Sequence, residues 1–306
     1  MTASGRFLGL DVGGTQVKAG LIDSDGERTR GVPQSTHLGQ GAEGFLDHLA
    51  QQARALGDFE RVGLGLPGVF RSNTSILHRS SNLPELVGVD LGAGLAKRLD
   101  MHPSQVLVGN DANLAAYGEQ GFGAGRGEQD LLLITLGTGV GGGVVLEGNV
   151  VTGPGSKGGE IGHILVKPRE LGGVLCGCGS YGCLETLVSA NSAKRRAQEA
   201  GLSGSLPEIC ERARAAAGPE RDLMHAIGRD LGSGLAYAVT LLDLSLFLVG
   251  GGFGGALDLL EPGALETLAE RNYGNDAPRL IPAALGEDAG WIGAARLAQG
   301  STAARE

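Results

Sequence analysis

The chain lacks the long apolar runs and basic clusters that mark membrane-spanning and nucleic-acid-binding proteins. No apolar run in its 306 residues reaches the roughly 18 residues that a membrane span needs, and the stretch LLDLSLFLVGGGF is broken by Asp243 and by glycines. Lys and Arg total 25 against 34 Asp and Glu, a formal charge of −9, so we expect neither nucleic-acid nor membrane partners. The first residues, MTASGRFLGLDVGG, lack the apolar core of a signal peptide, and we therefore expect a cytoplasmic protein.

Cysteine is scarce, whereas glycine is abundant. Three of the four cysteines lie in CGCGSYGCLE, residues 176–185, and persistent disulfides are rare in the cytoplasm. The 56 glycines gather in short runs after apolar strands, unlike the composition of a low-complexity linker. Such runs indicate turns at which the backbone approaches a ligand closely.

Strand and helix patterns are mixed along the chain, which predicts an α/β fold. Residues 6–12 and 16–23 are predicted to form two strands around a glycine turn, and residues 130–151 repeat this unit. The repetition predicts two lobes facing a cleft: a smaller one of residues 1–112 with about 290–306, and a larger one of residues 113–289. Helices are predicted at 42–56, 88–100, 112–120, 183–200, 206–217, 220–241, 256–272 and 289–299.

Three glycine turns follow apolar strands and are candidate phosphate-binding loops. They are LDVGGT (10–15), ITLGTGVGGG (134–143) and LVGGGFGG (248–255), and none has the P-loop spacing. A single turn of this kind is more often a structural hairpin, but glycines also free backbone N–H groups to face phosphate oxygens, and three such turns in one chain favour phosphate binding. Asp11 precedes the first turn, where its carboxylate is either a Mg²⁺ partner or a turn cap.

Asn110 and Asp111 end an apolar strand and begin a helix. One interpretation is a helix N-cap, for which both residue types are favoured. The other is a general base, Asp111, that accepts a proton from an alcohol, with the Asn110 amide orienting the substrate.

Cys176, Cys178 and Cys183, together with His163 in GGEIGH, make a complete ligand set for tetrahedral zinc. The intervening glycines permit the tight loop that such chelation needs. Because Cys-x-Cys departs from the common zinc spacing, reduced structural thiols and a redox pair stay open as alternatives. Cys210 lies in a helical pattern and is predicted to be a core thiol.

The motifs DVGGT, LPG, NDAN, LGTGVGGG, GGEIGH, CGCGSYGCLE and VGGGF resemble, in this order, those of the ROK family of sugar kinases and sugar-responsive repressors. The resemblance runs from about residue 7 to about 295. Within the family, the overall motif pattern is similar to that of the bacterial ATP-dependent glucokinase branch. It implies an actin-like ATPase (ribonuclease H-like) fold with two lobes around a cleft. It also implies a homo-oligomer, a dimer or a tetramer.

The resemblance assigns roles residue by residue. Asp111 matches the catalytic base, and the implied sugar ligands are Asn82, Asn110, Asp111, Glu160, His163 and Glu185. The implied ATP contacts are Gly13, Gly14, Thr15, Gly137, Thr138, Gly139, Gly251 and Gly252, to which we add Asp11. The implied structural zinc ligands are His163, Cys176, Cys178 and Cys183, with the second ring nitrogen of His163 facing the sugar.

Two positions depart from the family pattern. Many glucokinases of the family have lysine directly after GGT, whereas this chain has Gln16 and then Lys18; on a strand these two share a face. The segment NLPELVGVD lacks an aromatic residue often found there, which weakens the sugar assignment more than the fold.

The sequence thus predicts an ATP- and Mg²⁺-dependent kinase acting on the 6-hydroxyl of a hexose, with glucose first. Mannose, fructose, allose or an N-acetylhexosamine are alternative substrates. A sugar-responsive repressor is the remote alternative. Such family members carry an N-terminal helix-turn-helix domain, for which a first strand expected from residue 6 leaves no room, and the charge of −9 disfavours DNA binding.

Overall fold

The computed structural model describes residues 5–80, 82–271 and 277–300, apart from the side chain of Leu38. The chain divides into two compact units. Unit 1 comprises residues 1–129, 143–158 and 285–306, and unit 2 comprises residues 130–142 and 159–284. Residues 113–129 and 143–158 thus fall in unit 1, whereas the predicted lobe boundary near 112 assigns them to the larger lobe.

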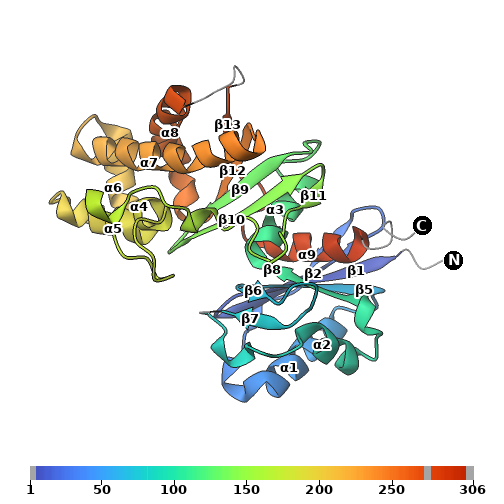
Figure 1. Cartoon of the computed structure of the whole chain (residues 1–306). Helices are drawn as coiled ribbons and strands as arrows, with labels where there is room; N and C mark the ends of the chain where they lie inside the picture. Colours follow the sequence, from blue (N-terminus) through green and yellow to red (C-terminus); the bar gives the residue numbers. More distant parts are fainter. Residues whose placement is uncertain (1–4, 81, 272–276, 301–306) are drawn as a thin grey trace. The chain divides into compact units, whose positions relative to one another are not determined.

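Unit 1 is built on a mixed sheet in the order β3-β2-β1-β5-β8, with β4 beside β2 (Figure 1). Strands β1 and β2 form an antiparallel hairpin, and β5 and β8 continue the sheet parallel to β1. Its strands are β1 (Arg6–Val12), β2 (Gln16–Asp23), β3 (Arg28–Arg30), β4 (Gln34–Ser35), β5 (Arg61–Leu66) and β8 (Val106–Asn110). A separate hairpin joins β6 (Val69–Phe70) to β7 (Leu77–Arg79). The helices are α1 (Gly41–Ala55), α2 (Leu91–Leu99), α3 (Asp111–Phe122) and α9 (Ala289–Gly300).

Alternation along the strands of unit 1 explains how helices cover both faces of its sheet. Strand side chains such as Leu8, Leu10 and Leu64 are fully buried in one core with residues of α1 and α2. On the opposite face the alternate positions are glycines, and a methyl group on Gly9 or Gly63 would overlap backbone atoms of α9. Helix α9 therefore packs directly on β1 and β5, so its lone tryptophan, Trp291, is buried.

A second sheet continues from the second glycine hairpin, and its residues 143–150 belong to unit 1 while its other strand residues belong to unit 2. The second sheet has the order β11-β10-β9-β12-β13, with β9, β12 and β13 parallel, and the division between the units falls within β10. Its strands are β9 (Leu131–Leu136), β10 (Val140–Leu146), β11 (Asn149–Val150), β12 (Leu246–Gly250) and β13 (Arg279–Pro282). The helices of unit 2 are α4 (Glu185–Val188), α5 (Ala190–Glu199), α6 (Leu206–Ala215), α7 (Pro219–Leu242) and α8 (Leu257–Arg271).

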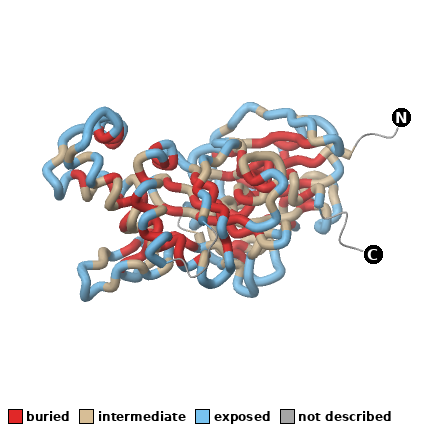
Figure 2. Tube along the Cα trace, turned by 90° about the horizontal axis from the view of Figure 1, so that it is seen from above, coloured by how far each residue is buried: buried red, intermediate tan, exposed pale blue. Residues whose placement is uncertain are grey.

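Within unit 2, α7 and α8 pack closely along each other because small residues line their contact (Figure 1). A methyl group on Gly228 of α7 would overlap the Leu260 carbonyl of α8. Cys210 of α6 is buried, as predicted for a core thiol. Buried stretches are concentrated inside each unit, whereas the outer loops are mainly exposed (Figure 2).

The predicted helix over 183–200 is wrong in one respect, because two helices occupy this range. Ser189 has extended backbone, and its side chain accepts a hydrogen bond from the Ser192 N–H, which makes it the N-cap of α5. None of the helices in the described parts of the chain is both long enough and apolar enough to cross a membrane.

Candidate active site and metal centre

Three predicted features meet at one edge of the unit 1 sheet. Strands β1, β5 and β8 are parallel, so their carboxyl ends share this edge. The strands end respectively at the glycine turn after Val12, at Pro67-Gly68 and at Asn110-Asp111. The Asn110 amide donates to the Gly68 carbonyl at 3.2 Å, which ties two of these strand ends together.

The structure assigns the N-cap role at this position to Asn110 and not to Asp111. Asn110 is the N-cap of α3, because its side-chain oxygen accepts a hydrogen bond of 3.0 Å from the Asn113 N–H. Asp111 is the first residue of the helix, and its side chain is half-buried. The cap is therefore provided without Asp111, whose carboxylate lies at the positive end of the helix dipole.

Asp11 lies close to Asp111 at the same edge. Burial first, and then the nearby Asp111 charge, raise the pKa of Asp11 to about 7, while Lys18 lowers it. A methyl group on Gly290 would overlap the Asp11 carboxylate, so the first turn of α9 approaches it directly. Two neighbouring carboxylates at a strand edge form an environment that favours a divalent cation.

Lys18 is opposite Asp11 in the β1–β2 register, and its ammonium lies 3.4 Å from the Glu287 carboxylate. Lys18 is thus engaged within unit 1. Gln16 is exposed at the end of the glycine turn, so of the two side chains it is the more accessible to a ligand.

The glycine turn of unit 1 is braced by a residue that the sequence did not point to. The Thr36 hydroxyl donates to the Gly13 carbonyl at 2.8 Å, and its N–H donates to the Thr15 carbonyl at 3.1 Å. Gly14 and Thr15 themselves are exposed. Thr36 directly follows the short strand β4 and belongs to no recognisable motif, so only the fold could reveal this contact.

Asn82 follows the β6–β7 hairpin and is exposed. The Ser80 hydroxyl donates to the Pro67 carbonyl at 2.7 Å and accepts from the Leu83 N–H at 3.1 Å. These bonds hold the segment that carries Asn82 at the end of β5, which is the edge that also carries Asp111.

The two glycine turns of unit 2 also lie together. Strands β9 and β12 are parallel neighbours, and they lead into Gly137–Gly139 and Gly251-Gly252 respectively. Gly251 has φ +82°, and a methyl group there would overlap the Leu136 backbone, so only glycine suits this position. Thr138 and Gly252 are exposed between these strand ends.

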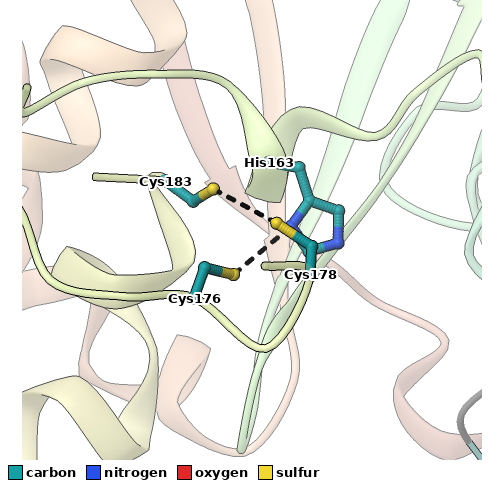
Figure 3. A group of neighbouring side chains, drawn as sticks. All are labelled: His163, Cys176, Cys178 and Cys183. Atoms are coloured by element: carbon teal, nitrogen blue, oxygen red, sulfur yellow. Dashed lines mark hydrogen bonds between the residues drawn. The ribbon is translucent and has the colours of Figure 1, made fainter. Parts of the chain in front are cut away.

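His163, Cys176, Cys178 and Cys183 point toward one another (Figure 3). One ligand atom from each lies within 4.8 Å of all the others. The Cys178 and Cys183 sulfurs are 3.6 Å apart, and the Cys176 sulfur is 3.7 Å from His163 Nδ1. Ligands about 2.3 Å from a tetrahedral ion are separated by about 3.8 Å, whereas a disulfide needs about 2.05 Å. The four ligand atoms are therefore close enough for one zinc ion, and two of their separations match the tetrahedral value.

The loop that carries the cluster is shaped by tight turns. The Cys176 N–H donates to the Ser180 carbonyl at 2.8 Å, and Gly179 and Gly182 have φ of +92° and +75°. Burial raises the pKa of Cys176 to about 12; the backbone N–H of Cys178 opposes this shift, and the side chains of Cys178 and Glu185 add to it. A divalent cation would oppose this shift, since metal coordination favours the thiolate.

The remaining predicted sugar ligands surround this cluster. With Nδ1 turned to Cys176, His163 places Nε2 4.0 Å from the Glu160 carboxylate. Glu160 and His163 are both exposed. Glu185 is half-buried; its Oε2 accepts from the Val140 N–H at 2.9 Å, and its Oε1 lies 3.4 Å from the Cys176 sulfur.

Comparison with known proteins supports the interpretation of these motifs. The model of the ROK family matches residues 7–301. The chain is 31% identical to a glucokinase from Thermotoga maritima over 95% of this chain and 96% of that protein. It is 32% identical to an N-acetylmannosamine kinase from Escherichia coli O139:H28 over 96% and 98% of the two chains.

A solved structure of a ROK glucokinase from Streptomyces griseus, in complex with glucose and AMPPNP, is also similar. Its TM-score is 0.75 and its sequence identity is 32%, and the match covers 97% of this chain and 100% of that chain. The predicted resemblance and the actin-like ATPase fold are thereby confirmed. The chain belongs to the ROK family.

Proposed function

We propose that this protein is an ATP-dependent hexokinase that phosphorylates the 6-hydroxyl of glucose. The observation that carries the proposal is the shared strand edge of unit 1, where Asp11, the first glycine turn and Asp111 come together. The S. griseus relative binds glucose and the ATP analogue AMPPNP. That relative supports both a sugar substrate and a nucleoside triphosphate donor.

The chemistry of the proposed reaction is assigned to Asp111. Its carboxylate accepts the proton of the 6-hydroxyl while that oxygen bonds to the γ-phosphorus, and the bond from phosphorus to the bridging oxygen of ADP breaks. Phosphate contacts are assigned to the turns Gly13–Thr15 and Gly137–Gly139, with Gly251-Gly252 toward the adenosine. Because the Gly13 and Gly137 N–H groups donate to the Gln16 and Gly139 carbonyls, the N–H groups that follow them in each turn are the proposed phosphate donors. Asp11 would hold the Mg²⁺ that accompanies ATP, which supplies charge neutralisation of the phosphates.

Hydroxyl recognition is assigned to a set of polar side chains. The proposed sugar ligands are Asn82, Asn110, Asp111, Glu160, His163 and Glu185. A site that pairs each sugar hydroxyl with an amide or a carboxylate discriminates strongly against analogues that lack one, because a buried partner would be left unpaired.

His163, Cys176, Cys178 and Cys183 are proposed to hold a structural zinc ion. Four protein ligands leave no open coordination position, so the ion would supply a cross-link and no Lewis-acid site. Elemental analysis of the purified protein tests this assignment. About one zinc per chain is expected, and a fully active protein without bound metal would refute it.

The test of the reaction is Asp111→Asn, assayed by ADP release against a panel of hexoses. Loss of a general base lowers kcat by about 10²–10⁴-fold. Asp90→Asn is a matched control, because Asp90 is the N-cap of α2 and the same carboxylate oxygen accepts from the Ala93 N–H and the Ser75 hydroxyl, roles that the asparagine oxygen also fulfils. Turnover of Asp111→Asn at the level of Asp90→Asn would remove Asp111 from the reaction.

A second substrate is favoured by one specific relative. The E. coli protein is named an N-acetylmannosamine kinase and is as similar to this chain as the glucokinases are. N-acetylmannosamine therefore belongs in the same panel. The sugar with the highest kcat/KM identifies the substrate, and glucose is the expected result.

A further inference from the structure

Glu185 is shared between the cysteine cluster and a glycine turn. It is the first residue of α4 and follows the last cysteine ligand by two positions. One carboxylate oxygen accepts the Val140 N–H at 2.9 Å, directly after Gly139, and the other lies 3.4 Å from the Cys176 sulfur. A single side chain thus contacts both the proposed metal site and the proposed phosphate-binding turn, all within unit 2.

The turn at Gly137–Gly139 is fitted closely around this carboxylate. A methyl group on Gly139 would overlap Glu185 Oε2, so glycine is needed there for the carboxylate to reach Val140. The Gly137 N–H donates to the Gly139 carbonyl at 2.9 Å, and the Gly137 carbonyl accepts from Ala190 at 2.8 Å. Contacts from α4 and from the start of α5 therefore set the direction of the N–H groups in this turn.

The other side of the turn contacts the segment that carries His163. A methyl group on Gly162 would overlap the Val140 carbonyl, so the short 3₁₀ helix Ile161–His163 lies against the strand that leaves the turn. His163 is the last residue of this 3₁₀ helix, and Cys183 precedes Glu185 by two residues, so each proposed ligand adjoins one of the two contacts to the turn. Fixing the ligands together would therefore fix the supports of the turn on both sides.

We propose that Glu185 is a positioning residue that couples metal occupancy of the cluster to nucleotide binding at Gly137–Gly139. The inference rests on the proposed function, and it assigns Glu185 a role besides sugar recognition. A bound metal orders Cys176 and Cys183, which orders Glu185, which in turn holds the Val140 N–H and the turn. Such coupling is reciprocal, so bound nucleotide must raise the affinity for the metal by the same factor by which bound metal raises the affinity for nucleotide.

The coupling is measured by binding, without sugar and without turnover. The affinity for AMPPNP is determined for the metal-loaded and the chelated wild type, and zinc affinity is determined with and without AMPPNP. Coupling between sites is typically 5- to 150-fold, and we expect about 10-fold in both measurements. In Glu185→Ala the two AMPPNP affinities should be equal. Glu199→Ala removes an exposed carboxylate paired with Arg195 in the same unit and should keep the wild-type factor.

A second variant keeps the proposal testable if Glu185→Ala does not fold. Gly139→Ala pushes a methyl group toward the Glu185 carboxylate from the side of the turn and should weaken zinc retention without nucleotide present. Gly252→Ala lies in the other turn with no atom within 4 Å of the added methyl group and should leave zinc retention unchanged.

Two results would overturn the inference, and they differ from failure of the proposed function. Equal AMPPNP affinity of the loaded and chelated wild type would disprove the coupling alone. An undiminished factor in Glu185→Ala, with unchanged zinc retention in Gly139→Ala, would show that Glu185 does not carry it. A protein that binds neither AMPPNP nor zinc would refute the proposed function and the coupling together.

Discussion

At the scale of single residues, Asp11 shows a conflict between stability and function. Its carboxylate is surrounded by the glycine-rich first turn of α9 and lies near Asp111. Burial and the Asp111 charge raise its pKa from 3.8 to about 7, so the ionised form is disfavoured in the folded protein. A cation that binds there would supply the missing positive charge, which suits a site prepared for Mg²⁺ and phosphate.

The pH dependence that follows from Asp11 has a definite sign. Between pH 3.8 and about 7 the unfolded chain has released this proton while the folded chain retains it, so stability falls as the pH rises. The loss is complete above the folded pKa and amounts to at most about 4 kcal/mol, since one pKa unit corresponds to about 1.4 kcal/mol.

Asp11→Asn should remove this contribution and flatten the pH dependence of stability. Urea unfolding at pH 5 and pH 8 without Mg²⁺ measures the effect. The variant should gain stability at pH 8 relative to the wild type, while its kinase activity is lost. Equal pH slopes for the two proteins would show that Asp11 is already ionised in the fold.

Residue-level prediction from the sequence worked where the chemistry is local. His163, Cys176, Cys178 and Cys183 are close along the chain, so residue type and short spacing were enough to predict that they meet. The Lys18–Glu287 ion pair and the Thr36 contacts to the first turn join segments distant in sequence. Neither residue type nor spacing carries that information, because the pairing depends on the packing of α9 and β4.

At the scale of elements, the alternation of glycine and leucine on β1 and β5 has a specific consequence. The strands were predicted from their apolar residues, but the glycines in FLGLDV and VGLGL give no sign of what approaches them. The structure shows that Gly9 and Gly63 make room for the backbone of α9. The predicted helix at 183–200 failed for a similar reason, since the capping role of Ser189 depends on its local backbone and not on periodicity.

Gly63→Ala should therefore destabilise unit 1 strongly. The added methyl group overlaps the Ala294 backbone, which no side-chain rotation can relieve, so we expect a loss of about 3 kcal/mol or more. Gly155→Ala is a suitable control, because no atom lies within 4 Å of its added methyl group and a change within about 0.5 kcal/mol is expected. Denaturant unfolding of both variants measures the difference, and equal stabilities would contradict the close packing of α9.

At the scale of the whole molecule, the repeated strand–glycine turn–strand pattern was the most informative signal. Each sheet contains such a pair, β1–β2 and β9–β10, and parallel strands extend each sheet from β1 or β9. The sequence revealed this repetition because glycine turns and apolar strands are local features. It did not reveal that the chain returns to unit 1 at residues 143–158, since that depends on where β10 continues.

Metal removal should loosen part of unit 2 and leave the stability of unit 1 unchanged. The proposed zinc ligands all belong to unit 2, and between residues 151 and 184 the regular helices are only the short 3₁₀ turns Ile161–His163 and Arg169–Leu171. The backbone hydrogen bonds of this segment belong to short turns and isolated bridges and not to a long helix or a sheet, so a metal cross-link is expected to contribute much of its order. Trp291 is the only tryptophan of the chain and is buried in unit 1.

Chelation should therefore accelerate hydrogen exchange over residues 163–188 while leaving β1 and β5 protected. The Trp291 fluorescence transition in denaturant should keep its midpoint, because it reports on unit 1. Cys178→Ala should reproduce the exchange pattern of the chelated protein, whereas Cys210→Ser, which changes a thiol of α6 outside the cluster, should still respond to chelation as the wild type does. A lower Trp291 midpoint after chelation would contradict this prediction. It would mean that a metal held by ligands of unit 2 also stabilises unit 1.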